Sequence, residues 1–356
     1  MAKLPEQNQI TQAIYDHYSD HQPDSRRYHL GGSMIGDECD RKLWYSFRWV
    51  KRIYHDGRLL ILFKRGHSEE SILVNHLRNI GIQVSDIDLE TGNQYQFSAY
   101  GGHFGCSLDG VATGIPGAEK TNHLLEFKTH NDKSFKELKD KGVMDSKPLH
   151  YAQMQVYMML SGLERALYVA VNKNDDELYT QRIHLDKEYA DKLLLKALRI
   201  ISSETPPEKL TEKPDFYKCK FCDFQDLCHY DEVAETNCRT CIHSTPELDS
   251  NGRWSCALHN IDIPEKGQRV GCENHLLIPQ LIPFAKQIDS GTNEISGDMY
   301  IKYEYQDCQF INTSTLKSMN GIPCYSSQEI RSINKQLIND ERLQSLRESF
   351  DGIIQS

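Results

Sequence analysis

Apolar residues along the first 200 positions follow helical and strand periods in turn. Residues 59–79 carry apolar side chains at helical spacing, including Leu62, Ile72 and Leu73, and predict a long helix. A strand-like stretch with glycine-rich turns follows, with β-forming residues over 94–99, 105–113 and 124–129. The pattern then predicts a helix, two strands and an amphipathic helix over 151–160, 166–172, 178–185 and 187–202. This order predicts a mixed α/β domain with a central sheet flanked by helices.

The two ends of the chain differ from this domain. Residues 1–25 are polar and predict an N-terminal helix, and a second helix is expected to carry Cys39. After Cys228 the sequence becomes poor in apolar residues. A C-terminal α+β extension then combines a strand-like piece over 299–310 with a helix over 327–350. We therefore expect three parts, with the bounds 1–236, 237–280 and 281–356.

The composition is that of a globular protein of two or three domains. The chain has 356 residues, of which 38% are apolar and 26% are charged. The best apolar stretch, 276–284, is broken by two prolines, so we expect no membrane-spanning helix. The N-terminus lacks the apolar segment of a signal peptide, which predicts a cytoplasmic protein. In that compartment eleven cysteines indicate metal ligation rather than disulfides.

The net charge of −10 hides a basic segment near the N-terminus. Between positions 26 and 65 there are ten Lys or Arg and four Asp or Glu, a net charge of +6. Seven aromatic residues are interleaved with them, and cations beside aromatic faces are the chemistry of single-strand binding. The alternative is an amphipathic helix with core aromatics and a solvated basic face. The residues predicted to contact DNA are Arg41, Lys42, Arg48, Lys51 and Arg52.

Three charged residues make the strand-like stretch a candidate for chemistry. In Glu126-Phe127-Lys128 the outer residues are two apart, so on a strand both side chains leave the same face. Asp109 ends the preceding predicted strand, and an antiparallel return of the chain would bring it close to Glu126. Two such carboxylates suit Mg²⁺ or Mn²⁺, and Lys128 can orient water or offset charge during phosphodiester hydrolysis. The alternative is a buried Glu–Lys pair at a sheet edge.

These residues, followed by Gln153-x-x-x-Tyr157 on the next predicted helix, resemble the motifs of the PD-(D/E)xK nuclease superfamily in its RecB-like branch. The resemblance implies a restriction-endonuclease-like fold with a mixed central sheet. It also implies that Gln153 and Tyr157 position the DNA strand and the catalytic lysine. Leu108 stands where the family's name has a proline, a position that we expect to be permissive.

The same resemblance completes the metal site. In the family an upstream histidine joins the two carboxylates, and His67 on the preceding predicted helix occupies a suitable place. The main-chain carbonyl of Phe127 would be a further ligand. The implied ligands for Mg²⁺ or Mn²⁺ are therefore His67, Asp109, Glu126 and Phe127.

Four cysteines form a set that spans most of the predicted nuclease domain. Cys39 stands alone near the N-terminus, and Cys219, Cys222 and Cys228 follow in a C-x2-C-x5-C cluster. Four thiolates can hold an iron–sulfur cluster or a zinc ion, and the residues alone leave both open. The set resembles that of the iron–sulfur nucleases of CRISPR spacer acquisition and of AddB-type subunits. This resemblance implies a 4Fe–4S cluster that closes the two ends of the domain.

A second set of four cysteines lies just downstream, in a segment too poor in apolar residues to build a core. Its members are Cys238, Cys241, Cys256 and Cys272. We expect them to hold a structural Zn²⁺ that supplies the missing folding energy, although nearby histidines (His243, His259 and His275) could replace one thiolate. Cys106, Cys308 and Cys324 are assigned no chemistry.

Together these features predict a metal-dependent DNA exonuclease acting on single strands or duplex ends in recombination, repair or end processing. One alternative is an endonuclease or RNA nuclease on the same scaffold, and another is a non-catalytic, metal-stabilised DNA-binding subunit. The chain has no G-x-x-x-x-G-K-[ST] motif, so helicase activity would come from a partner protein. A homo-oligomer and a setting in a bacterium or a phage-infected cell are further expectations.

Overall fold

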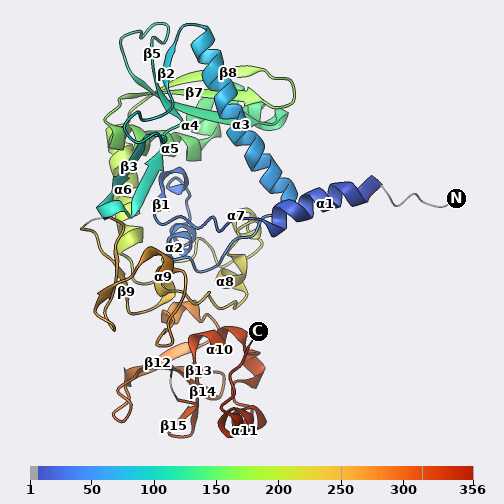
Figure 1. Ribbon diagram of the computed structural model, residues 1–356, viewed down its shortest axis with the longest axis vertical. Helices are drawn as coiled ribbons and strands as arrows, with labels where there is room; N and C mark the ends of the chain where they lie inside the picture. The colour runs from blue at the N-terminus through green and yellow to red at the C-terminus, as the bar shows by residue number, and fades with distance from the viewer. Residues whose placement is uncertain (1–6, 250, 315, 356) are drawn as a thin grey trace, which may run out of the picture. The chain divides into compact units, whose positions relative to one another are not determined.

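The computed structural model describes residues 7–249, 251–314 and 316–355, which fall into two compact units (Figure 1). The first unit comprises Met1–Asp37 and Ile53–Arg199, and the second comprises Glu38–Arg52 and Ile200–Ser356. Cys39 therefore belongs to the same unit as Cys219, Cys222 and Cys228. The predicted three-part division stays a prediction. Within the described residues no helix has the length and apolar character needed to cross a membrane.

A five-stranded mixed sheet forms the centre of the first unit. Its order is β2-β5-β6-β7-β8, in which β6 and β7 are parallel and all other neighbours are antiparallel. Parallel neighbours need a long crossover, and here it contains two helices, α4 and α5. The strands are β2 (Gln83–Ser85), β5 (Gly110–Thr113), β6 (His123–His130), β7 (Arg165–Asn172) and β8 (Leu178–His184).

The helices of the first unit begin and end at residues suited to those places. The side chain of Asp56 accepts a hydrogen bond from the Leu59 amide at the start of α3, and Pro148 occupies the first turn of α5. Gly162 ends α5 in a left-handed conformation. The helices are α1 (Gln7–Asp20), α3 (Gly57–Asn79), α4 (Asp132–Ser146), α5 (Pro148–Ser161) and α6 (Lys187–Ser202).

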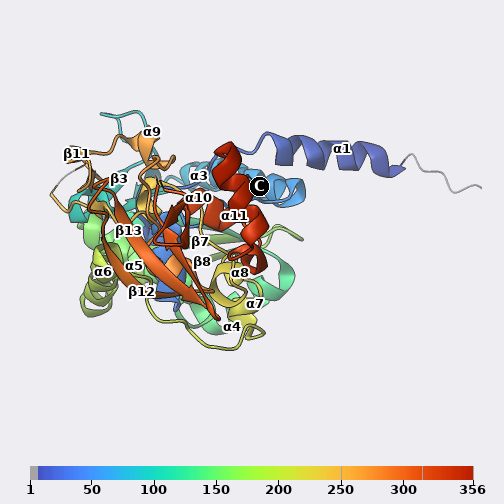
Figure 2. The ribbon, with the colours of Figure 1, turned by 90° about the horizontal axis from the view of Figure 1, so that it is seen from below.

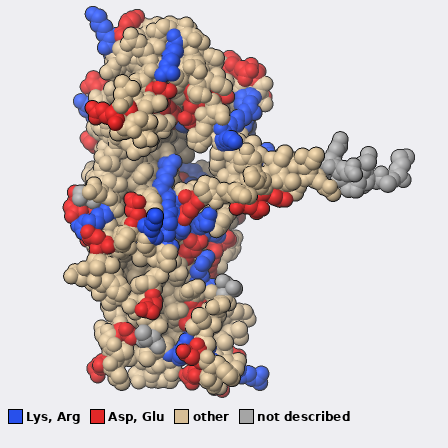
Figure 3. Space-filling view, in the orientation of Figure 1, with Lys and Arg blue, Asp and Glu red and all other residues tan. Residues whose placement is uncertain are grey.

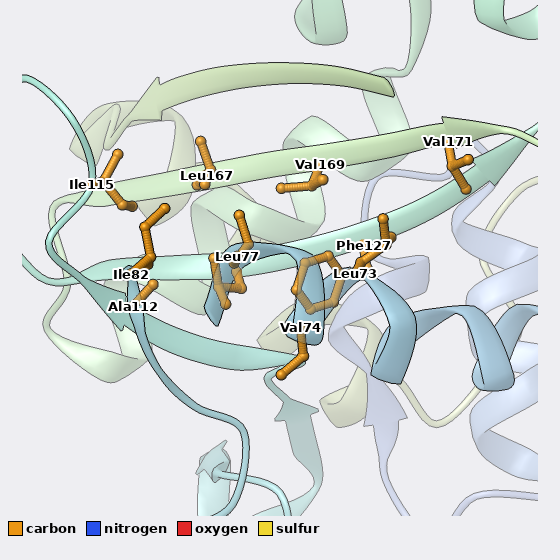
Figure 4. Packing of buried hydrophobic residues seen from close by; sticks show 11 residues of the cluster. Leu73, Val74, Leu77, Ile82, Ala112, Ile115, Phe127, Leu167, Val169 and Val171 are labelled. Atoms are coloured by element: carbon orange, nitrogen blue, oxygen red, sulfur yellow. The ribbon is translucent and has the colours of Figure 1, made fainter. Parts of the chain in front are cut away.

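Strand alternation divides the central sheet into a core face and a face that carries charge. Leu125 and Phe127 on β6 and Val169 on β7 pack with Leu73 and Leu77 of α3 in one apolar cluster (Figure 4). Glu126 and Lys128 alternate with these residues, so their side chains leave the opposite face of β6. On that face Gln153 of α5 contacts Glu126. The sheet therefore presents two charged side chains toward α5.

A second, smaller sheet and two short 3₁₀ turns complete the first unit. The order is β1-β4-β3, with β1 (Leu30–Gly31) parallel and β3 (Gln96–Ala99) antiparallel to β4 (Phe104–Ser107). The turns η1 (Gly32–Met34) and η2 (Tyr100–Gly102) follow β1 and β3. The segment around η1 approaches α5 closely, because a Cβ atom added at Gly36 would lie 2.7 Å from the Cβ of Ala152.

Two glycine substitutions should have opposite effects on stability, because Gly36 lies in this close contact whereas Gly66 lies in open space. Gly36→Ala should destabilise the protein by about 1–3 kcal/mol, because Ala152 and the Leu149 backbone leave no room for a methyl group. Gly66→Ala should stabilise it by about 0.5–1 kcal/mol, since Gly66 lies inside α3 and its Cβ would meet nothing within 4 Å. Thermal unfolding of both variants checks the pair, and equal shifts would contradict the packing of η1 on α5.

The second unit begins with a helix whose aromatic residues form its core. Helix α2 (Asp40–Arg48) buries Trp44, Tyr45 and Phe47, and Trp254 packs on Phe47 with ring centroids 5.3 Å apart. The short helices here are α7 (Tyr217–Lys220), α8 (Gln225–His229), α9 (Glu265–Gln268) and η3 (Cys238–Thr240). A small antiparallel sheet of order β11-β10-β9 comprises β9 (Ser244–Pro246), β10 (Trp254–Cys256) and β11 (Ile261–Asp262).

The C-terminal part of the second unit is a five-stranded sheet of order β12-β13-β14-β16-β15, whose strands are drawn in orange and red in Figure 2. Its β14 and β16 are parallel, and its other neighbours are antiparallel. The strands are β12 (Lys286–Thr292), β13 (Met299–Tyr305), β14 (Cys308–Asn312), β15 (Ser318–Met319) and β16 (Ile322–Tyr325). The helical segments are η4 (Pro279–Leu281), α10 (Ser327–Ser332), η5 (Lys335–Leu337) and α11 (Glu341–Phe350).

The mixed α/β class predicted from the sequence is confirmed, as are most of its elements. Three predicted elements are wrong in their extent. The strand over 105–113 is two strands in different sheets, and the strand over 299–310 is a β13–β14 hairpin. The helix over 327–350 is two α-helices, α10 and α11, with the 3₁₀ turn η5 between them, because the chain restarts at new N-caps, Asn334 for η5 and Asp340 for α11.

Candidate active site and metal-binding cysteines

The hairpin formed by β5 and β6 brings the predicted acidic residues together. Gly110 pairs with Leu125 in the antiparallel register, which places Asp109 next to Glu126. Asp109 precedes β5 rather than ending a strand, which corrects the sequence expectation. Its Oδ2 accepts a hydrogen bond of 2.8 Å from the Phe127 amide. The carboxylate is thus fixed to the backbone of the strand that carries Glu126 and Lys128.

Both carboxylate oxygens of Glu126 are engaged by neighbouring side chains. Lys128 Nζ forms an ion pair with Glu126 Oε1. Gln153 Nε2 donates a hydrogen bond of 2.9 Å to Glu126 Oε2. The side chain of Glu126 is 1% exposed and that of Lys128 is 27% exposed, so the pair reaches solvent only through the lysine. The sequence placed all three residues here, the first two by strand spacing and Gln153 by the resemblance.

Burial and repulsion make this cluster electrostatically costly. Burial raises the pKa of Glu126 to about 7, Lys128 lowers it, and the neighbouring Asp109 carboxylate raises it again. Burial also raises the pKa of Asp109, against the effect of Lys128. Two desolvated carboxylates that repel each other favour the binding of a cation between them. The hard oxygen donors present are of the kind that Mg²⁺ and Mn²⁺ prefer.

His67 lies near this cluster without completing it. It is exposed on α3, and its Nδ1 lies 3.0 Å from the Phe63 carbonyl oxygen. Its charge lowers the pKa of Asp109, which places the two groups within electrostatic reach. Within the described parts of the chain, however, no group of three or more His, Cys, Asp or Glu is arranged to hold a metal ion. The ligand set of His67, Asp109 and Glu126 stays a prediction.

Glu70 is a site residue that the sequence reasoning missed. It follows His67 by three positions on α3, so the two side chains share a face of the helix. Burial raises the pKa of Glu70, and the Asp109 carboxylate raises it further while His67 and Lys128 lower it. Its spacing of three residues from His67 on a predicted helix could have indicated that both side chains face the same site.

Tyr157, the other residue implied by the resemblance, is buried behind the site. Its side chain is 4% exposed, and a Cβ added at Gly32 would lie 2.7 Å from its Cε1. Burial raises the pKa of the Tyr157 hydroxyl above its usual range, and Glu126 raises it further. A direct contact of this side chain with a DNA strand stays a prediction, since the ring is packed inside the first unit.

A chain of buried hydrogen bonds lies behind Lys128. The Tyr168 hydroxyl lies 2.9 Å from His130 Nε2 and 2.9 Å from His150 Nδ1, and the Nδ1 of His130 lies 3.0 Å from Ser134 Oγ. Tyr168 pairs with Glu126 in the register of β6 and β7. Burial lowers the pKa of His130 to about 4 and that of His150 to about 3, and Lys128 lowers both further. Both imidazoles are therefore neutral at pH 7.

These neutral histidines predict a loss of stability in acid. Because their pKa values are lowered on folding, the unfolded chain binds protons first as the pH falls below about 6.5. Between pH 6.5 and 4 the free energy of unfolding should fall by up to about 1.4 kcal/mol per pH unit for each histidine. Urea titrations of His150→Asn should show a shallower pH slope than the wild type. A slope as steep as that of the wild type in His150→Asn would contradict the hydrogen-bond network.

The four cysteines of the predicted iron–sulfur set belong to the second unit, where Cys39 interacts electrostatically with each of the other three thiols. Cys39 is the N-cap of α2, Cys219 lies in α7 and Cys228 lies in α8. Burial raises the pKa values of the Cys219, Cys222 and Cys228 thiols, and Cys39 raises each of them further. All eleven cysteines of the chain are free thiols. Among the described residues, however, these thiols do not form a group of three or more that is arranged to hold a metal ion, so the iron–sulfur cluster stays a prediction.

The second cysteine set is gathered in the same way. Burial raises the pKa of Cys238 to about 11, and Cys272 and Cys256 raise it further. Burial raises the pKa of Cys241 to about 12, with Cys272 and Cys238 again adding to the shift. Cys272 Sγ lies 3.7 Å from His259 Nε2. The Nε2 of His275 lies 2.9 Å from the Asn237 carbonyl oxygen, whereas its Nδ1 is buried and has no hydrogen-bond partner within the described residues.

The predicted DNA-binding residues do not form one solvated basic face. Arg48 is 2% exposed, and its guanidinium lies over the rings of Trp254 and Trp44, at 5.0 and 5.5 Å. Its assignment to DNA contact is wrong, because the group is enclosed by the aromatic core. Lys51 Nζ is paired with Glu232 at 2.9 Å and with Asp226 at 3.3 Å. On the face drawn in Figure 3, Lys and Arg side chains lie among Asp and Glu side chains.

Most aromatic residues of this segment are part of the core, as the alternative to DNA binding predicted. Trp44, Tyr45, Phe47 and Trp49 are at most 2% exposed and belong to the core. Tyr54, in contrast, is 66% exposed. DNA contact by Arg41, Lys42, Lys51 and Arg52 stays a prediction.

Arg48→Gln is expected to reduce stability rather than DNA affinity. The guanidinium donates hydrogen bonds to three backbone carbonyls, those of Ser203, Arg239 and Ser244. Truncating it would remove these three hydrogen bonds and open space between the tryptophan rings, at a cost of about 2–4 kcal/mol. Urea unfolding checks the loss, and the salt dependence of DNA binding should stay that of the wild type. A flatter salt slope at unchanged stability would return Arg48 to the DNA-binding set.

The matches to known proteins come from solved structures. No protein-family model and no curated protein sequence matches the chain. An alkaline exonuclease (LHK-Exo) from Laribacter hongkongensis is similar at 16% identity and a TM-score of 0.37, over 52% of this chain and 90% of that one. The same exonuclease in complex with dAMP matches at 14% identity and a TM-score of 0.36, over 52% and 90%. The protein SSO0001 matches at 16% identity and a TM-score of 0.35, over 62% and 96%. At these identities and TM-scores, the matches do not identify functional residues in this chain.

Proposed function

We propose that this protein is a divalent-metal-dependent nuclease that hydrolyses phosphodiester bonds of DNA. The observation that supports the proposal is the buried cluster of Asp109, Glu126, Lys128 and Gln153 on the β5–β6 hairpin and α5. A structural ion pair needs one carboxylate, whereas this cluster holds two that repel each other. Such an arrangement is typical of a site for a divalent cation beside a catalytic lysine.

The side chains of the site have distinct proposed roles. Asp109, Glu126 and the carbonyl of Phe127 would hold Mg²⁺ or Mn²⁺, with His67 as a further ligand. The bound cation would polarise the phosphodiester and acidify the attacking water. Lys128 orients that water and offsets the negative charge that develops on the phosphoryl oxygens. Gln153 holds the Glu126 carboxylate in place through its hydrogen bond of 2.9 Å.

The finer assignment rests on the resemblance to the RecB-like branch. We propose an exonuclease on single-stranded DNA or duplex ends, in recombination, repair or end processing. The second unit would carry a 4Fe–4S cluster on Cys39, Cys219, Cys222 and Cys228, a proposal that rests on the resemblance and on the electrostatic interaction of Cys39 with the other three thiols. Zn²⁺ would be held by Cys238, Cys241, Cys256 and Cys272. A helicase or recombination partner and a homo-oligomer stay predictions.

The test is cleavage of end-labelled DNA by protein purified without oxygen, with added Mg²⁺ or Mn²⁺. Linear single strands and duplexes should be degraded from their ends, and covalently closed circles should stay intact. Nicking of the circles would replace the exonuclease with an endonuclease, and cleavage of RNA alone would change the substrate. DNA that is bound and stays whole with either metal would sink the nuclease proposal and favour a non-catalytic binding subunit.

A further inference from the structure

A cavity in the second unit has a lining that is rich in hydrogen-bond donors. Its volume is about 340 Å³, and it is formed by residues from α2, α8, η4 and β12 together with the loop around Lys209. Every lining residue belongs to the second unit, so the cavity is separate from the proposed active site. Its polar side chains are those of Arg41, Lys209, His229, Asp231, Gln280 and Gln287.

Several of these donors are not satisfied by the protein. Arg41 donates through Nε to the Pro207 carbonyl at 2.6 Å and through one terminal nitrogen to the Tyr45 hydroxyl at 3.4 Å. Within the described residues Arg41 has no carboxylate at ion-pair distance. The Nε2 of His229 is buried and has no hydrogen-bond partner there. A buried polar atom without a partner is costly, and it indicates a group that comes from outside the chain.

The charge balance of the lining favours an anion. Asp231 is the lining carboxylate, and it is already paired with Lys335 at 2.9 Å. Lys209 is paired with Glu212 at 3.1 Å, which leaves the Arg41 guanidinium as the lining cation without a carboxylate partner within the described residues. The Cys228 thiol also lines the cavity and interacts electrostatically with Arg41. The amides of Gln280 and Gln287 make no hydrogen bond within the described residues and add neutral donors to the lining.

We propose that this cavity binds a phosphoryl group. A guanidinium fork matches the oxygens of a phosphoryl group in geometry and charge, and the amides and the imidazole supply further hydrogen bonds. The cavity volume of about 340 Å³ is at the lower end of the range for small-molecule sites. It is large enough for a phosphoryl group with an attached sugar. The same chemistry is found in a free phosphate and in the terminal phosphate of a DNA strand. Binding here does not depend on the proposed nuclease activity.

The test uses two substitutions in strand β12, each made in the Lys128→Ala variant. This background is expected not to cleave DNA, so cleavage does not affect the binding measurement. Gln287→Glu places a carboxylate in the lining, whereas Thr292→Glu adds the same charge to β12 outside it. Both positions are exposed, so both variants should fold. Isothermal titration with inorganic phosphate should give binding that Gln287→Glu weakens by about tenfold or more, because like charges repel at close range. Thr292→Glu should bind phosphate as the parent does.

A second measurement distinguishes the source of the phosphoryl group. An oligodeoxynucleotide with a 5′-phosphate is compared with the 5′-hydroxyl form of the same sequence, without added divalent metal. If the 5′-phosphate strengthens binding in Thr292→Glu and not in Gln287→Glu, the cavity takes a strand end. If phosphate binds and the two oligonucleotides are equivalent, the cavity takes a free phosphate. Absence of phosphate binding, or equal weakening by both glutamates, would overturn the proposal.

Discussion

Lys128→Ala is expected to abolish DNA cleavage and to leave DNA binding close to that of the wild type. Lys128 is the cation beside Glu126, and its Nζ pairs directly with that carboxylate. Removing a preorganised charge from a desolvated site typically lowers turnover by about 10² to 10³ or more. Single-turnover cleavage of end-labelled DNA measures the loss, and fluorescence anisotropy of the same DNA measures binding.

The matched control is a second Glu-x-Lys triplet in the same unit. Glu137-Leu138-Lys139 lies on α4, where the Lys139 side chain is 45% exposed and is paired with Glu177 at 2.5 Å. An exposed ion pair of this kind contributes little, so Lys139→Ala should cleave DNA as the wild type does. If Lys128→Ala retained full turnover, the assigned active site would be wrong. If both variants lost activity together, the effect would reflect folding or net charge rather than the site.

The predictable part of the site is the part fixed by short-range geometry. Strand alternation places Glu126 and Lys128 on one face of β6 and Phe127 on the other, and the structure has this arrangement. The apolar neighbours Leu124 and Leu125 predict a buried strand, and both are buried in the structure. This apolar context distinguishes Glu126-Phe127-Lys128 from the triplet on α4. Gln153 was found through the motif on the following helix. Each of these inferences needed only the sequence near the residue.

The predictions from sequence that failed concern residues whose environment is formed by residues far away in the sequence. Arg48 carries a charge that suits DNA, and nothing near it in sequence shows that Trp254 encloses it. Glu70 joins the site because α3 packs against the sheet, a tertiary contact that a helical pattern does not specify. Likewise, Glu38–Arg52 folds with the chain beyond Ile200, across about 150 residues of the first unit. Local periodicity carries no information about such long-range partners.

Cys222→Ala is the second variant for which we expect a large effect. Cys222 is half-buried, and its thiol lies within electrostatic reach of Cys39. If the four thiols hold a 4Fe–4S cluster, protein purified without oxygen should be brown, and the variant should lose the visible absorption. A cofactor that binds the folded state stabilises it, so its loss should lower the unfolding temperature. For a unit of this size we expect a decrease of about 10 °C, corresponding to about 3 kcal/mol.

Cys308→Ala is the control, because Cys308 lies in β14 of the same unit and is assigned no ligand role. It should keep the colour, the metal content and the unfolding temperature of the wild type to within about 2 °C. Iron, sulfide and zinc analysis then separates the two cysteine sets. Cys222→Ala should lose iron and sulfide and keep zinc, since Cys238, Cys241, Cys256 and Cys272 are untouched. A colourless wild type with two zinc ions per chain would disprove the cluster while leaving both sets as metal sites.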